Sequence, residues 1–144
     1  MFHHILIVCT ANICRSPIAE VLFRERLTDR SICVDSAGLS ALVGREMCKD
    51  AAKMLSENGY DGSRHRAQQL TMPMLHSADL VLVMQDDQVS GIVGMAPEAR
   101  GKVLLLGKWQ GDATVPDPYR LSKAAYQHAY RLIDQAVESW IKYI

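Results

Sequence analysis

Residues 5–8 are four consecutive apolar residues, and a loop that begins with Cys9 follows them at once. A strand that is apolar at every position is typical of a parallel sheet whose two faces are both covered by helices. Pro17 fits the first turn of a helix, and Ser16 is a suitable N-cap for it. The pattern therefore predicts a strand, a short loop and a helix, in a fold where ligands bind beyond the carboxyl ends of the strands.

Cys9 and Arg15 stand at the two ends of this loop. The residues between them let the backbone curl until successive N–H groups converge on one point, which forms a nest for an anion. The start of the next helix adds its N–H groups and dipole, and Arg15 offers a planar pair of donors to two oxygens. The same donors and the Ser16 hydroxyl favour a thiolate at Cys9. We interpret Cys9 as a nucleophile beneath a tetrahedral oxyanion; the alternative is a small buried residue that ends a strand.

The chain has the size of one domain, and we expect residues 1–144 to form a single domain around one core. Its 16 basic and 16 acidic residues balance, which argues against nucleic acid as the main ligand. No apolar run approaches the roughly 20 residues of a membrane span, and the N-terminus lacks the basic start of a signal peptide. We therefore expect a cytoplasmic protein with no membrane insertion and with reduced cysteines. No metal ion and no cofactor are expected at its site.

Apolar periodicity and turn residues predict the remaining elements. Further strands are expected at 32–35, 80–84 and 103–106, and helices at 47–58, at 72–77 with a Thr71 cap, and at 87–95. Residues 36–38 are expected to form a turn, and residues 107–119 a loop long enough to indicate function. Strands that alternate with helices predict a three-layer α/β/α sandwich with a four-stranded parallel sheet and a phosphate loop after the first strand.

The C-terminal segment has the pattern of an amphipathic helix. The residues expected on its apolar face are Leu121, Ala125, Ala129, Leu132, Ile133, Ala136, Val137, Trp140, Ile141 and Ile144. Cys33, within a predicted strand, and Cys48, at the start of a predicted helix, are interpreted as packing residues.

Residues 8–17 resemble the signature of the low-molecular-weight protein tyrosine phosphatases. Residues 35–38, 79–84 and 116–119 agree with the same family in order and spacing, so the resemblance covers essentially the whole chain. Residues 36–44 and the closing helix look most like the Gram-negative enzymes linked to exopolysaccharide export. Those enzymes dephosphorylate a tyrosine-rich tail on a membrane-bound tyrosine autokinase. The resemblance thus implies a phosphotyrosine phosphatase that also holds phosphate or sulfate in its loop, with such a kinase as its partner.

The family's reaction needs an acid to protonate the departing phenolate, and the resemblance assigns this role to Asp117. Prolines on both sides pre-set its loop; the residues alone would favour an ordinary turn aspartate. The resemblance also implies that Ser36 and His65 hold Asn12, a residue type that tolerates left-handed backbone. For His65 alone, an ordinary surface histidine is nearly as good an interpretation.

The resemblance places substrate contacts in the loop itself and in two walls beside it. Tyr119 and Leu42 would flank the substrate's ring, and the expected contacts within the loop are Thr10, Ala11, Asn12, Ile13, Cys14 and Ser16. For Cys14 we expect a reversible disulfide that protects Cys9 from over-oxidation, against the alternative of a packing thiol. Ala11 departs from the family, which usually has glycine there, and would be strained by about 1 kcal/mol if the backbone needs a positive φ.

Three other functions fit part of the pattern. An arsenate reductase of the same fold needs additional cysteines past the middle of the chain, and no cysteine follows Cys48. A phosphocysteine carrier protein of a sugar transport system needs neither a gripping arginine nor a general acid. A binding-only phosphotyrosine trap has Ala11 as its sole support, because Cys9, Arg15 and Asp117 are all present. The sequence therefore favours the phosphatase.

Overall fold

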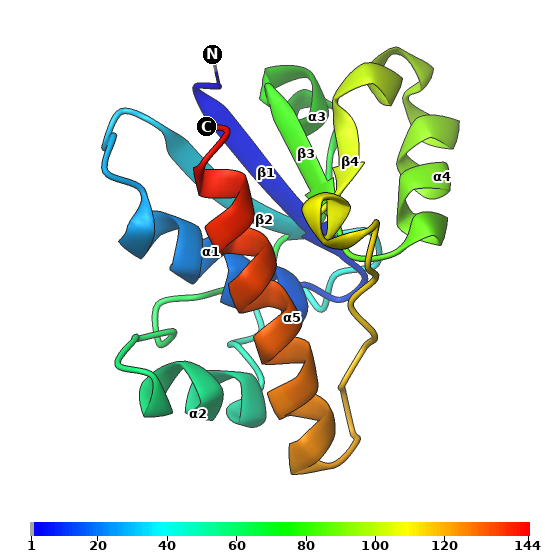
Figure 1. Ribbon diagram of the computed structural model, residues 1–144. Coiled ribbons are helices and arrows are strands. Elements are labelled where there is room, and N and C mark those ends of the chain that lie inside the picture. Colours follow the sequence, from blue (N-terminus) through cyan, green and yellow to red (C-terminus); the bar gives the residue numbers. More distant parts are fainter. Residues whose placement is uncertain (1) are drawn as a thin grey trace.

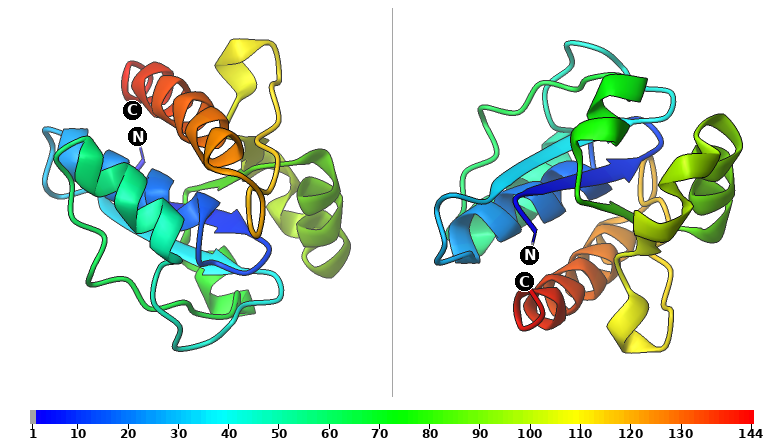
Figure 2. Two further views of the ribbon diagram at one scale, coloured as in Figure 1. Left: turned by 90° about the horizontal axis from the view of Figure 1, so that it is seen from below. Right: turned by 90° about the horizontal axis from the view of Figure 1, so that it is seen from above.

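The computed structural model describes residues 2–144 and contains one four-stranded sheet in which all neighbouring strands run parallel. From edge to edge, its strands are β2 (Cys33–Gly38), β1 (His4–Cys9), β3 (Leu80–Val83) and β4 (Val103–Leu105). Helices cover both faces, as Figures 1 and 2 show. The three-layer α/β/α sandwich predicted from the sequence is confirmed.

One face of the sheet carries α1 (Arg15–Arg26), α2 (Lys49–Glu57) and α5 (Lys123–Ile141). The other face carries α3 (Met72–Ser77) and α4 (Asp86–Met95). Two single 3₁₀ segments, Pro97–Lys102 and Lys108–Gln110, lie before and after β4. None of the helices in residues 2–144 is both long and apolar enough to cross a membrane.

Strand β1 lies in the centre of the sheet and buries both of its faces. Ile5 and Ile7 pack with α1 and α5, whereas Leu6 and Val8 pack with α3 and α4. Each of these four side chains is at most 1% exposed. The apolar run therefore forms the strand expected of it, and Cys9 ends that strand at its carboxyl edge.

The segment 36–38 is the carboxyl half of strand β2, so the predicted turn there is wrong. Ser36 pairs with Ile7, and Gly38 pairs with Cys9, because the central strand offers its full backbone edge to this segment. Glycine is required at position 38, since a Cβ would lie 2.6 Å from the Thr10 carbonyl oxygen. Strand β2 thus reaches as far as the loop that follows β1.

Helix α1 begins two residues earlier than predicted. Cys14 is the N-cap residue, without a side-chain capping bond, and Ser16 lies inside the first turn. Pro17 is in the first turn, as expected. Because Ser16 is not needed as a cap, its hydroxyl is available to the loop between β1 and α1.

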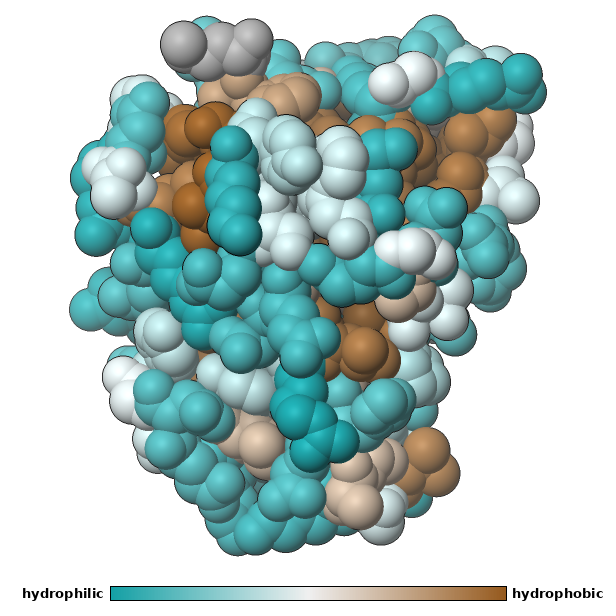
Figure 3. All heavy atoms as spheres, viewed as in Figure 1, coloured by the Kyte–Doolittle hydropathy of each residue, from teal (hydrophilic) through white to brown (hydrophobic). Residues whose placement is uncertain are grey.

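Helix α5 packs along α1 and beside α2, and its outer surface is mostly hydrophilic (Figures 1 and 3). Its buried face includes Tyr126 and Tyr130, which the apolar pattern did not include. Leu121 was expected on that face but precedes the helix and is 60% exposed. Cys33 was expected to pack inside the sheet, but it is exposed at the start of the edge strand β2.

Candidate active site

The loop of residues 9–15, here called the cradle loop, turns its carbonyl oxygens outward. Each of six successive carbonyls accepts a hydrogen bond from outside the loop: Cys9 from Leu39 N at 3.0 Å, Thr10 from Ser40 N at 2.9 Å, Ala11 from Leu42 N at 3.1 Å, Asn12 from His65 Nε2 at 2.6 Å, Ile13 from Cys48 N at 2.9 Å and Cys14 from Ile18 N at 3.2 Å. Within residues 2–144, the N–H groups of residues 10–14 donate no hydrogen bond. A trans peptide with its carbonyl outside has its N–H inside. The loop is therefore an anion nest.

Cys9 lies at the base of the cradle loop and is 2% exposed. Its Sγ atom lies 2.9 Å from Oγ of Ser16, in the first turn of α1. A thiolate at this position can accept the Ser16 hydroxyl hydrogen and faces the positive end of the helix dipole. Both features favour negative charge on the Cys9 sulfur.

Asn12 holds the shape of the cradle loop from within. Its φ of 61° is left-handed, and its side chain is fully buried. Asn12 Nδ2 donates to Oγ of Ser16 at 2.8 Å and to Oγ of Ser36 at 2.9 Å. Its Oδ1 accepts from the backbone N–H of Gln68 at 2.9 Å. His65 contacts the main-chain oxygen of Asn12, not its side chain.

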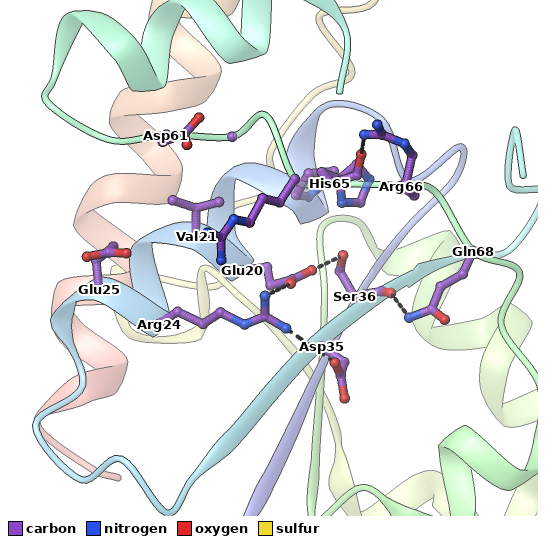
Figure 4. A pocket seen from close by; sticks show the side chains of 13 residues that line it. Glu20, Val21, Arg24, Glu25, Asp35, Ser36, Asp61, His65, Arg66 and Gln68 are labelled. Atoms are coloured by element: carbon purple, nitrogen blue, oxygen red, sulfur yellow. Dashed lines mark hydrogen bonds and ion pairs between the residues drawn. The ribbon is translucent and has the colours of Figure 1, made fainter. Parts of the chain in front are cut away.

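Glu20 determines which groups donate and which accept in this hydrogen-bond network. Its carboxylate accepts from the Ser36 hydroxyl at 2.5 Å and pairs with Arg24 at 2.8 Å, as Figure 4 shows. A carboxylate can only accept hydrogen bonds, so the hydroxyl hydrogen of Ser36 points to Glu20. A lone pair on the Ser36 oxygen then accepts the hydrogen bond from Asn12 Nδ2. The Ser16 oxygen likewise accepts a hydrogen bond from Asn12 Nδ2 through a lone pair. The hydroxyl hydrogen of Ser16 therefore remains available to the Cys9 sulfur.

Arg15 connects three segments at the carboxyl edge of the sheet. Its buried Nη1 donates to Oε1 of Gln85 at 2.8 Å and to the Val115 carbonyl at 2.9 Å. Its Nη2 lies 3.9 Å from Oδ2 of Asp117. Since Nη1 is held, Nε and Nη2 form the edge of the guanidinium that can meet two oxygens of an anion.

Asp117 lies on the loop before α5, and half of its side chain is exposed. Its Oδ1 accepts from the backbone N–H of Tyr119 at 3.1 Å, a turn that Pro116 and Pro118 restrict further. A small cavity of about 40 Å³ lies between this loop and the cradle loop; its lining residues are Cys9, Ala11, Asn12, Ile13, Cys14, Arg15, Asp117 and Tyr119. The three residues predicted to be catalytic therefore meet around one cavity.

Three predicted contacts, Thr10, Ser16 and Leu42, do not line this cavity. Leu42 is partly exposed and does not line the cavity, although its backbone N–H binds the Ala11 carbonyl. Thr10 is exposed, and its hydroxyl accepts from Gln88 Nε2 at 3.2 Å. Ala11 does not have a positive φ, so the backbone strain considered for alanine at this position is not present.

Gln85 and Gln88 also belong to the site, although neither was predicted from the sequence. Gln85 caps α4, Gln88 returns the bond in a capping box, and Gln88 Oε1 also accepts from the Met84 N–H at 2.9 Å. The spacing of two glutamines directly after a buried strand is the signal that could have identified them. Through Arg15 and Thr10, they join α4 to the cradle loop.

A second and larger hollow, of about 430 Å³, lies behind the cradle loop (Figure 4). Charged side chains of both signs line it, including Glu20, Arg24, Arg64 and Arg66. Neither Cys9 nor Arg15 nor Asp117 reaches it. The chemistry of the cradle loop therefore belongs to the small cavity and not to this hollow.

Comparisons with known proteins agree with this geometry. Residues 4–144 match the family model described as low molecular weight phosphotyrosine protein phosphatase. The low molecular weight protein-tyrosine-phosphatase Etp of Escherichia coli K12 is 40% identical over 141 residues, 98% of this chain and 94% of Etp. Vibrio vulnificus Wzb in complex with benzylphosphonate has a TM-score of 0.95 and 42% identity over 100% of both chains. The tyrosine phosphatase Wzb of Escherichia coli K30 in complex with sulphate has a TM-score of 0.93 and 40% identity over 99% of this chain and 98% of that one.

Proposed function

This chain belongs to the low molecular weight phosphotyrosine protein phosphatase family, and we propose that its cradle loop hydrolyses phosphotyrosine through a phosphocysteine at Cys9. The observation that carries the proposal is the arrangement of the cradle loop, which faces its N–H groups toward one point above a buried sulfur. A phosphoryl group has three oxygens that such donors fit, and its charge is what they stabilise.

In the first step, the Cys9 thiolate attacks phosphorus in line with the phenolic oxygen, so an S–P bond forms as the P–O bond breaks. The N–H groups of residues 10–14 and the Nε and Nη2 edge of Arg15 hold the three remaining oxygens. Asp117 gives its proton to the departing phenolate, which is otherwise a poor leaving group.

In the second step, water attacks the phosphocysteine and releases inorganic phosphate. Asp117, now a carboxylate, takes a proton from that water. The S–P electron pair returns to Cys9, where the Ser16 hydroxyl at 2.9 Å stabilises the regenerated thiolate. The side chains of Asn12, Ser36 and His65 are positioning groups, because they hold the loop and the Ser16 hydroxyl without contacting the phosphoryl group.

We propose a phosphotyrosine protein as the substrate, with Tyr119 against its ring and Leu42 at the outer margin of the cleft. The buried sulfur favours the long reach of tyrosine over that of serine. The resemblance to exopolysaccharide-linked enzymes supports a tyrosine autokinase tail as the natural substrate and the cytoplasm as the location.

Hydrolysis of phosphotyrosine and phosphoserine peptides by the purified protein tests this proposal. We expect phosphotyrosine hydrolysis that needs no added metal and is blocked by vanadate, and a phosphoryl adduct on the tryptic peptide 1–15 after rapid acid quench. Cys9→Ser should abolish turnover, whereas Cys33→Ser, an exposed cysteine away from the cradle loop, should leave it unchanged. Turnover that survives Cys9→Ser would overturn the proposal.

A further inference from the structure

A second pair of cysteines lies directly beside the cradle loop. Sγ of Cys14 lies 2.7 Å from Sγ of Cys48, the N-cap residue of α2. The hydroxyl of Tyr126, on α5, lies 3.7 Å from the first sulfur and 3.5 Å from the second. The two thiols, here called the thiol pair, therefore sit between the loop, α2 and α5.

We propose that the thiol pair is an oxidation site, at which hydrogen peroxide joins Cys14 to Cys48 in a disulfide. The backbones are already in register, because the Cys48 N–H donates to the Ile13 carbonyl at 2.9 Å. The sulfurs need to approach by less than an ångström to reach the S–S bond length of about 2.05 Å. The disulfide would tie the cradle loop to the start of α2.

The two thiols differ in a way that assigns their roles. Cys48 is half-buried and reaches solvent, whereas Cys14 is 4% exposed. The hydrogen bond from Cys14, supported by one from Tyr126, lowers the pKa of Cys48 to about 7. The same pairing, together with burial, raises the pKa of Cys14, and burial raises that of Tyr126, so both remain donors. Cys48 is the thiolate that meets the oxidant, and Cys14 is the thiol that resolves it.

The reaction balances with peroxide as the oxidant. The Cys48 thiolate attacks one peroxide oxygen, the O–O bond breaks, and Cys48 becomes a sulfenic acid as hydroxide leaves. The Cys14 sulfur then attacks the Cys48 sulfur, the S–O bond breaks, and the hydroxyl takes the Cys14 proton and departs as water. Each sulfur gives one electron; the hydroxide from the first step takes up the proton that Cys48 lost to solvent on ionisation, so the peroxide ends as two waters.

The thiol pair competes with the link between Cys9 and Cys14 that the sequence predicted. Cys14 contacts Cys48 and Tyr126, while the Cys9 sulfur contacts Ser16. A disulfide with Cys48 removes the thiol that Cys9 would need. Under limited peroxide, we therefore expect the Cys14–Cys48 link to form before any Cys9–Cys14 link.

Tryptic mapping without reduction separates these outcomes. Cys9 and Cys14 share the peptide 1–15, whereas Cys48 lies on the peptide 46–49, because cleavage follows Arg15, Arg45 and Lys49. After limited peroxide and alkylation, we expect peptide 1–15 joined to peptide 46–49. An internal disulfide in peptide 1–15 without this joined product, or Cys48 oxidised to sulfinic acid without it, would overturn the proposal.

Variants keep this test independent of the proposed phosphatase chemistry. Cys9→Ser should retain the joined peptides, which then can arise only through Cys14. Cys33→Ser is the matched control and should also retain them. Cys48→Ser should lose them and show unchanged phosphatase activity before oxidation; Cys48→Ala serves if the serine variant unfolds. Joined peptides missing from Cys9→Ser would contradict the assignment of Cys14.

Discussion

The guanidinium of Arg15 lies 3.9 Å from the carboxylate of Asp117, so the first turn of α1 meets the loop before α5 across the small cavity. The guanidinium is buried and the carboxylate is half-exposed. A buried cation that faces an exposed carboxylate fits the two halves of the proposed reaction: Arg15 holds charge on the phosphoryl group, and Asp117 exchanges protons with the leaving group and with water.

Replacing Asp117 with asparagine should lower kcat by an amount that depends on the leaving group of the substrate. Asparagine keeps the side-chain shape but cannot give a proton, so phenyl phosphate should lose about 10²–10⁴-fold in kcat. An aryl phosphate whose phenol is acidic has a leaving group that needs little protonation, so its kcat should fall far less. Steady-state kinetics on both substrates make the measurement, with Asp112→Asn in the same loop as the control. Equal losses on the two substrates would remove the general-acid role.

Two replacements of Asn12 separate its backbone from its side chain. Asn12→Gly keeps the left-handed φ but loses the hydrogen bonds to Ser16, Ser36 and Gln68. Asn12→Ala loses the same bonds and adds the Cβ cost of a left-handed residue, about 1 kcal/mol. Both replacements should lower kcat. In thermal unfolding, the glycine variant should have a higher Tm than the alanine variant. Equal stability of the two would contradict the φ argument.

A methyl group at position 38 should disturb the cradle loop. The Cβ of Gly38→Ala would meet the Thr10 carbonyl oxygen at 2.6 Å and backbone atoms of Ala11 and Ala41 at 3.1 Å. Relief requires a backbone shift, with an overpacking cost of about 1–3 kcal/mol. The free energy of unfolding, measured in urea, and kcat/KM should both fall. Gly94→Ala on α4, where the added Cβ meets no atom within 4 Å, should be neutral or stabilising by about 0.5–1 kcal/mol.

Glutamine at position 20 should weaken catalysis without touching the substrate. Its amide can donate to the Ser36 oxygen, which competes with the bond from Asn12 and loosens the chain that orients Ser16. We expect kcat to fall by about 3- to 10-fold, within the range of one neutral hydrogen bond, with KM unchanged. Glu25→Gln, exposed on the same helix, is the control. An effect on KM alone would contradict a positioning role.

The sequence predicted the elements whose signals are local. The run at residues 5–8 is buried on both faces, Thr71 caps α3 by accepting from the Met74 N–H, and the loop from Cys9 to Arg15 follows from its spacing. The turn-forming residues at 36–38 were misassigned because strand pairing with β1 overrides local propensity. The local sequence pattern therefore predicts a segment's structure only where tertiary contacts do not override it.

The missed residues of the site depend on contacts between distant segments. Gln85 reaches Arg15, Glu20 reaches Ser36, and Cys48 reaches Cys14 only after the sheet has formed. No spacing in one sequence encodes such pairs. The grouping of Cys9 and Arg15 at a helix start could be predicted because they are neighbours along the chain, but the residues that orient them could not.

The reactivity of Cys48 should depend on pH with a midpoint set by its neighbours. The thiolate is the reactive form, so in Cys9→Ser/Cys33→Ser protein the alkylation rate of Cys48 should rise with pH and be half-maximal near 7. Tyr126→Phe removes a donor to this thiolate, so the midpoint should move to higher pH. Tyr130→Phe is the matched control, because its buried hydroxyl has no hydrogen-bond partner within residues 2–144. If both tyrosine variants keep the wild-type midpoint, Tyr126 does not stabilise the Cys48 thiolate.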